Sequence, residues 1–110
     1  MDLITPQELY QRLAGAEQLE GAEKAPLVLD VRQAQETLAE GQIAGALCIP
    51  LDQLGARVRE IAQGREVVTV CKRGARSLNA AQWLAQSGHR VKSMSGGMDA
   101  WLAAGLPVQR

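Results

Sequence analysis

Phenylalanine is absent from this chain of 110 residues, and its aromatic residues are one tyrosine and two tryptophans. The hydrophobic core must therefore be built mainly from leucine, valine, isoleucine and alanine. Because the formal net charge is zero, the bulk charge does not suggest nucleic acid or an anionic membrane as a partner. At this length we expect a single domain, residues 1–110, that is long enough to bury a core.

Several features that define other protein classes are missing as well. The two cysteines, Cys48 and Cys71, are too few for a disulfide framework, and His89 has no partner at metal-ligand spacing and is expected at the surface. The first residues lack the charged and apolar regions of a signal peptide, and no apolar run approaches the roughly 20 residues of a membrane span. We therefore expect a soluble cytoplasmic protein that uses no metal or cofactor and binds neither nucleic acid nor membrane.

Strand-like and helix-like segments alternate along the chain. Apolar or β-branched runs at 27–29, 47–49, 66–70 and 91–94 are typical of strands. Apolar residues at helical spacing lie between these runs, and residues 15–26 are expected to form a surface connection. This order predicts a three-layer α/β sandwich, in which helices cover both faces of a mainly parallel sheet.

One β-branched run ends in a cysteine, Cys71, and a short loop with Gly74 then leads into a helical pattern. In an α/β sheet, ligands bind beyond the carboxyl ends of the strands, where loop N–H groups and a helix N-terminus stabilise an anion. Nearby cations favour a thiolate in the same way. The cations of this loop are Lys72, Arg73 and Arg76. We therefore interpret Cys71 as an ionised nucleophile in a sulfur-handling site, rather than as an inert buried thiol.

Three groups of residues together resemble the rhodanese family of sulfurtransferases. The sequence Cys-Lys-Arg-Gly-Ala-Arg-Ser at 71–77 is similar to the family's active-site loop. Residues 29–32, Glu36 and the turn-rich stretch 41–46 resemble its upstream motifs, and residues 95–101 resemble its C-terminal Gly-Gly…Trp motif. The resemblance covers nearly the whole chain in order. It implies a rhodanese-like sandwich with a central, mainly parallel sheet of five strands.

The resemblance also implies a two-step sulfur transfer at Cys71. The thiolate would attack the outer sulfur of thiosulfate, or of a related small anionic donor, release sulfite and become a persulfide. Cyanide, a thiol or a protein acceptor would then remove that sulfur. Arg76 is the loop cation best placed by its spacing to bind the donor and stabilise the persulfide. The substrate-binding residues implied by the resemblance are Lys72, Arg73, Gly74, Ala75, Arg76 and Ser77.

Three upstream residues are expected to support the loop. Asp30 and Arg32 lie at a strand end near the predicted site, where they are expected to hydrogen-bond the loop and brace it. The alternative for these two is a solvated pair or a structural turn. Glu36 is a candidate partner for a loop arginine. We expect none of the three to be catalytic.

The chain departs from the family pattern outside the cysteine loop. Gln42, Ala44 and Cys48 stand where the family usually has His, Pro and Asn, and the stretch 36–41 is one residue longer. Cys48 is interpreted as a small buried hydrophobic residue, and a resolving thiol for Cys71 is the alternative.

Loop length separates sulfur chemistry from phosphate chemistry. Four residues lie between Cys71 and Arg76, one fewer than in the related phosphatases, so a single sulfur atom fits better than a phosphate or an arsenate. Two other interpretations remain open, a carrier that accepts a persulfide from a partner protein and a non-catalytic regulatory module on the same fold. The intact cysteine and the cationic loop favour an enzyme over the module.

Overall fold

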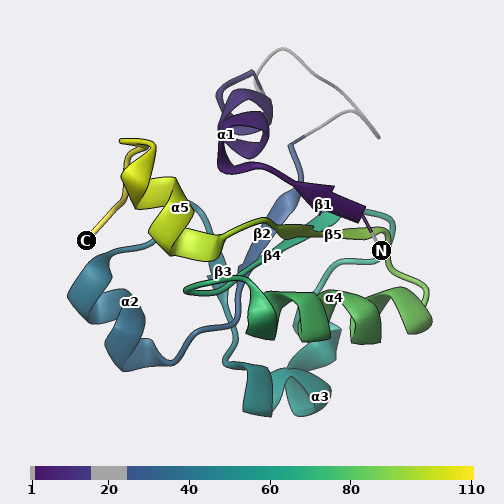
Figure 1. Ribbon diagram of the computed structural model, residues 1–110. Coiled ribbons are helices and arrows are strands. Elements are labelled where there is room, and N and C mark those ends of the chain that lie inside the picture. Colours follow the sequence, from purple (N-terminus) through teal and green to yellow (C-terminus); the bar gives the residue numbers. More distant parts are fainter. Residues whose placement is uncertain (1, 16–24) are drawn as a thin grey trace.

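A parallel sheet of five strands organises the computed structural model, which describes residues 2–15 and 25–110 (Figure 1). The strand order is β1-β5-β4-β2-β3, and every neighbouring pair is parallel. This confirms the predicted sheet and makes β4, the strand before Cys71, the central one. The strands are β1 (Asp2–Ile4), β2 (Leu27–Asp30), β3 (Leu47–Cys48), β4 (Val67–Val70) and β5 (Val91–Met94).

Four of these strands coincide with the runs expected from the sequence, whereas the sequence does not predict β1. Its three residues give almost no periodic signal, and the strand forms by pairing along β5, where Asp2 lies opposite Lys92 and Ile4 opposite Met94. Most of the expected surface connection, residues 16–24, lies outside the described residues.

Helices cover both faces of the sheet, as predicted. Figure 1 shows α1 and α5 on one side of it and α3 and α4 on the other. No described helix has the length and apolar content needed to span a membrane. The helices are α1 (Pro6–Ala14), α2 (Ala34–Glu40), α3 (Leu54–Arg57), α4 (Ala75–Gln86) and α5 (Gly97–Ala103), and short 3-10 turns, η3 (Leu51–Gln53) and η4 (Val58–Glu60), flank α3.

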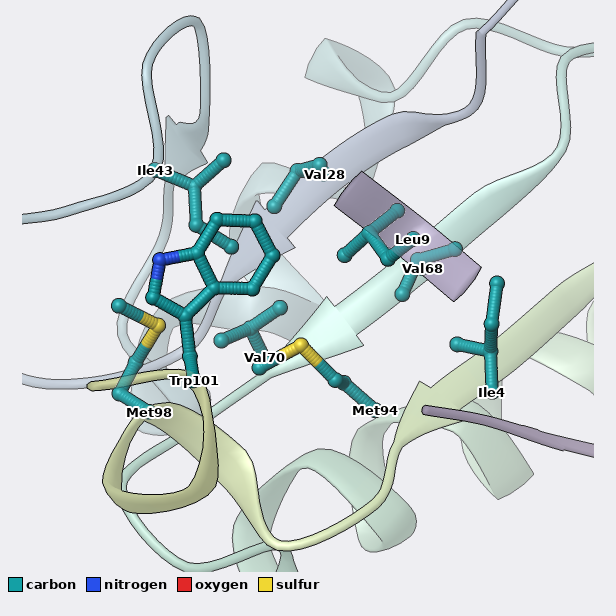
Figure 2. Close-up of a cluster of buried hydrophobic side chains, with 9 residues drawn as sticks. All are labelled: Ile4, Leu9, Val28, Ile43, Val68, Val70, Met94, Met98 and Trp101. Carbon is teal, nitrogen blue, oxygen red and sulfur yellow. The ribbon is translucent and has the colours of Figure 1, made fainter. Parts of the chain in front are cut away.

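Side chains alternate along β4 between two buried clusters. Val68 and Val70 pack toward α1 and α5 in a cluster that includes Trp101 (Figure 2), whereas Val67 and Cys71 pack toward α3 and α4. The cluster in Figure 2 is Ile4, Leu9, Val28, Ile43, Val68, Val70, Met94, Met98 and Trp101. The period of two along the strand therefore directs Cys71 to the face on which α4 begins.

The C-terminus of α4 corrects one expectation. His89 was expected at the surface, but it is only 7% exposed. Gly88 has a φ of 94° and ends the helix, so that the His89 N–H donates to the Leu84 carbonyl at 3.1 Å. This Schellman-type turn folds the imidazole inward, where Nδ1 has no hydrogen-bond partner among the described residues. The sequence predicts the turn at Gly88 but not whether the His89 side chain points inward or outward.

The N-terminus of α5 is held directly against the cysteine loop. The N–H groups of Met98 and Asp99 donate to the carbonyls of Cys71 and Lys72 at 2.8 and 2.9 Å. Gly97 has a φ of 60°, and a Cβ at this position would lie 2.5 Å from the Cys71 oxygen and from the Lys72 carbonyl carbon. A glycine is therefore required for this close approach, and not only for the tight turn.

The stability of a Gly97→Ala variant tests whether the close approach, and not only the positive φ, requires a glycine at this position. We expect Gly97→Ala to lower the free energy of unfolding by roughly 3–5 kcal/mol, since backbone strain adds to a clash that only backbone movement relieves. Gly105→Ala is the matched control, because its φ is 73° and its Cβ would meet nothing within 4 Å. It should lower the free energy by roughly 1–2 kcal/mol. Urea unfolding measures both, and equal losses would contradict the role given to Gly97.

Candidate active site

Cys71 lies at the carboxyl end of the central strand and just before the first turn of α4. Its side chain is buried, with 1% exposure. Gly74, the residue that precedes α4, has a φ of 111°, and its N–H donates to the Cys71 Sγ at 3.0 Å. The left-handed conformation of Gly74 turns the loop back over the sulfur, so that the loop surrounds this atom with hydrogen-bond donors.

Two buried serines continue this hydrogen-bond network. The Cys71 Sγ lies 3.4 Å from the Ser77 Oγ, which donates to the Gly74 carbonyl at 3.1 Å and lies 2.9 Å from the Ser93 Oγ. Ser93 is buried, and Ser77 is the one side-chain partner that its hydroxyl has among the described residues. Either hydroxyl of this pair can be the donor. When Ser93 donates to Ser77, the Ser77 proton can turn from the Gly74 carbonyl to the sulfur of an ionised Cys71.

These contacts determine the pKa of Cys71. Burial raises the pKa of this thiol, but the hydrogen bonds from the Ser77 hydroxyl and from the N–H groups of Ser77, Gly74 and Arg73 outweigh burial. The net result is a pKa below the ordinary value of a cysteine. The thiolate is thus stabilised by hydrogen-bond donors of the loop.

The loop cations make a smaller contribution than the sequence suggested. Each of them is paired with a carboxylate from a neighbouring helix, which reduces the positive potential at the sulfur. Arg76 forms two hydrogen bonds of 2.8 Å with Glu36. Lys72 binds Glu40 at 2.8 Å and Asp99 at 3.3 Å, and the largely exposed Arg73 lies 3.6 Å from Asp99. Glu36 therefore does meet a loop arginine, which is Arg76.

Asp30 and Arg32 form a buried ion pair behind the loop rather than in contact with it. The Arg32 Nη2 donates to Asp30 at 2.7 Å and to the Gly41 carbonyl at 2.9 Å, and its Nη1 lies 3.4 Å from Glu40. Within the described part of the chain, neither side chain hydrogen-bonds the loop 71–77. The predicted direct brace is therefore replaced by an indirect one, in which Arg32 holds Glu40 and Glu40 holds Lys72.

Two of the three departures from the family pattern contact each other. Cys48 is half-buried and hydrogen-bonded rather than a fully buried hydrophobic residue, because its thiol donates to the Gln42 side-chain oxygen at 3.2 Å. Partial burial raises the pKa of Cys48. Cys48 lies beside Asp30, which lies beside Val70, so two inter-strand spacings of about 4.8 Å separate Cys48 from the end of β4. That separation exceeds the Cα distance that a disulfide spans. A direct Cys48–Cys71 bridge therefore requires backbone movement.

The part of the chain that the structure describes contains no cluster of three metal-ligating side chains. Its apolar cavity of about 470 Å³ lies elsewhere, between α1, α5 and the C-terminal residues, and includes Ala44 in its wall. The sulfur and its hydrogen-bond donors are thus the chemically distinctive feature of the site.

The family model for the rhodanese-like domain matches residues 5–104. The chain belongs to the rhodanese-like domain family. The sulfurtransferase of Allochromatium vinosum is 39% identical to this chain over 106 residues, which are 96% of this chain and 92% of the relative. The resemblance inferred from the motifs at 29–46, 71–77 and 95–101 is thereby confirmed.

Solved structures agree with this rhodanese assignment. A rhodanese-related protein from Thermoplasma volcanium matches with a TM-score of 0.86 at 28% identity, over 99% of this chain and 98% of that one. A thiosulfate sulfurtransferase from Pseudomonas aeruginosa matches with a TM-score of 0.78 at 28% identity, over 98% of this chain and 19% of that one. These relatives support sulfurtransferase activity at the level of the family.

Sequence reasoning missed Ser93, Glu40 and Asp99 in this rhodanese site. A serine inside the short strand β5 was a usable signal for Ser93, because a polar side chain within a buried sheet needs a hydrogen-bond partner. The two carboxylates had no such signal. Glu40 meets Lys72 across 32 positions, and that pairing depends on how α2 packs against the loop.

The hydroxyl network predicts how the pKa of Cys71 responds to substitution. Ser77→Ala removes a donor to the thiolate and should raise this pKa, and Ser93→Ala should raise it by less because it acts through Ser77. Ser87→Ala is the control, since the Ser87 hydroxyl donates only to a carbonyl of its own helix, that of Trp83. The pH dependence of iodoacetamide alkylation, with Cys48 replaced by serine throughout, measures the pKa. A midpoint unchanged in Ser77→Ala would contradict the network.

Proposed function

We propose that this rhodanese-like chain is a sulfurtransferase that takes the sulfane sulfur of thiosulfate, or of a related small anionic donor, onto Cys71 as a persulfide. A thiol, cyanide or a protein acceptor then receives the sulfur. The observation that carries this proposal is the lowered pKa of a cysteine whose sulfur accepts an N–H hydrogen bond at the start of α4. A lowered pKa increases the fraction of the cysteine that is present as the nucleophilic thiolate.

In the first step, the Cys71 thiolate attacks the outer sulfur of the donor. A bond forms between the two sulfur atoms, and the bond between the outer and inner sulfur of thiosulfate breaks, so that sulfite leaves with the electron pair. The negative charge then resides on the terminal sulfur of the persulfide. The loop N–H groups that favour the thiolate also stabilise this charge, because they already point at the sulfur.

In the second step, the acceptor attacks the terminal sulfur of the persulfide. The new bond joins the acceptor to that sulfur, and the electron pair of the broken bond returns to the Cys71 Sγ. The cysteine is again a thiolate, and the reaction needs no external oxidant or reductant. Proton transfer is also unnecessary when the donor and acceptor are anions, in agreement with a site in which the loop N–H groups and the serine hydroxyls lie nearest to the sulfur.

The carrier hypothesis shares Cys71 and differs only in the donor. In that case a partner protein supplies the persulfide, and thiosulfate reacts slowly. The pairing of each loop cation with a carboxylate favours this alternative, since it weakens the attraction for a small dianion. Steady-state rates with thiosulfate, a small persulfide and a protein persulfide distinguish the two.

Replacement of the two cysteines tests the proposal. Cys71→Ser should lower the rate of cyanide-dependent thiosulfate turnover by about 1000-fold or more, because an unactivated hydroxyl does not form the persulfide. Cys48→Ser should keep turnover within about twofold of the unmodified protein, because Cys48 is two strands away from the end of β4. Thiocyanate formation measures both, and circular dichroism checks the fold. Full activity in folded Cys71→Ser protein would rule out the proposed mechanism.

A further inference from the structure

The charged side chains around Cys71 form a neutral cluster. Each of the four cations in it contacts a carboxylate, and the carboxylates are also four. A cluster of this kind does not attract a dianion over distance, because its potential falls off faster than that of an excess charge. The cations are Arg32, Lys72, Arg73 and Arg76, and the carboxylates are Asp30, Glu36, Glu40 and Asp99.

Within this cluster, Glu36 occupies the hydrogen-bonding edge of Arg76. Two guanidinium nitrogens of Arg76 donate to the two Glu36 oxygens, each at 2.8 Å. Glu36 is also held from its own helix, because the Gln33 N–H donates to it at 2.8 Å as part of a capping box. The carboxylate is thus fixed from two directions, and the fork geometry of Arg76 that would bind a sulfonate is already engaged.

Arg76 lies in the first turn of α4, directly after the loop that surrounds the Cys71 sulfur, so its pairing with Glu36 bears on donor binding. The pKa of Arg76 is raised first by its hydrogen bond with Glu36, and the charge of Cys71 contributes to the same shift. The hydrogen bond from Arg76 also lowers the pKa of Glu36 to about 2, so this carboxylate is ionised at any pH used in an assay. A dianionic donor beside Arg76 must therefore displace Glu36 or bind against its negative charge.

This inference rests on the proposed function and concerns the class of donor. We propose that Glu36 is a specificity-determining residue that disfavours dianionic donors, so that the preferred substrates carry one negative charge, as thiosulfonates and alkyl persulfides do. In a thiosulfonate an organic group replaces one charged oxygen of thiosulfate, and the charge is shared by the outer sulfur. The Cys71 thiolate attacks that sulfur, the bond to the sulfonyl sulfur breaks, and a sulfinate leaves with the electron pair.

The test compares thiosulfate with methanethiosulfonate, which differ by one charge at the group that leaves. KM is measured for each donor, with cyanide as acceptor, in the unmodified protein and in Glu36→Gln. Glutamine keeps an oxygen that can accept the Gln33 N–H, so the capping box is retained. The matched control is Glu60→Gln, because Glu60 forms a similar two-nitrogen pair with Arg57 outside this cluster, at 2.7 and 3.0 Å.

We expect Glu36→Gln to lower the KM for thiosulfate about tenfold and the KM for methanethiosulfonate less than about threefold. Glu60→Gln should change neither. Equal changes with both donors, weaker use of both donors, or no change would overturn the inference while leaving sulfur transfer intact. A different result would contradict the proposed function itself. In that case neither donor would place a sulfur on Cys71 of the unmodified protein, and both proposals would be wrong.

A binding measurement keeps the inference testable if Glu36→Gln does not fold. Cys71→Ser does not react, so calorimetric titration of this variant with each donor reports the charge preference of the site alone. The dissociation constant for thiosulfate should exceed that for methanethiosulfonate about tenfold. Equal affinities, or tighter binding of thiosulfate, would overturn the assignment of donor class.

Discussion

The hydrogen bond from the Asp99 N–H to the Lys72 carbonyl determines how the cysteine loop is arranged. In a trans peptide the C=O and the N–H point in opposite directions, so a Lys72 carbonyl that faces α5 turns the Arg73 N–H away from α5. That N–H is one of the groups that lower the pKa of Cys71. The requirement for glycine at position 97 follows, because any Cβ there would push α5 away from this carbonyl.

In this site, the groups that stabilise the thiolate are not the ionised side chains of the loop. Backbone N–H groups and a serine hydroxyl stabilise the negative sulfur at short range, whereas the ionised side chains are paired with one another at the rim of the loop. Fixed dipoles in a buried site stabilise charge without any reorganisation during the reaction. Because these side chains are already paired, we propose that the site distinguishes sulfur donors by the number of negative charges that each donor carries. In this proposal Cys71 determines the reactivity of the site, and Glu36 determines its selectivity for the donor.

The local parts of this arrangement could be predicted from the sequence. A few neighbouring residues encode the strand that leads to Cys71, the glycine at the sharp turn and the helix that follows. The capping box that begins α1 is encoded in the same local way. The carboxylate partners could not be predicted, because pairs such as Lys72 with Glu40 join residues that are distant in the sequence. Likewise, β1 exists only through its pairing with β5, and the burial of His89 depends on the tertiary packing around the end of α4.

The measurement that most directly tests the central claim is mass spectrometry of the protein after treatment with a sulfane-sulfur donor, followed by peptide mapping. The account predicts a mass increase of one sulfur atom on the peptide that contains Cys71, and the loss of this increase when cyanide is added. The peptide that contains Cys48 should remain unmodified. A protein that gains no sulfur on Cys71, or gains it first on Cys48, would contradict the account.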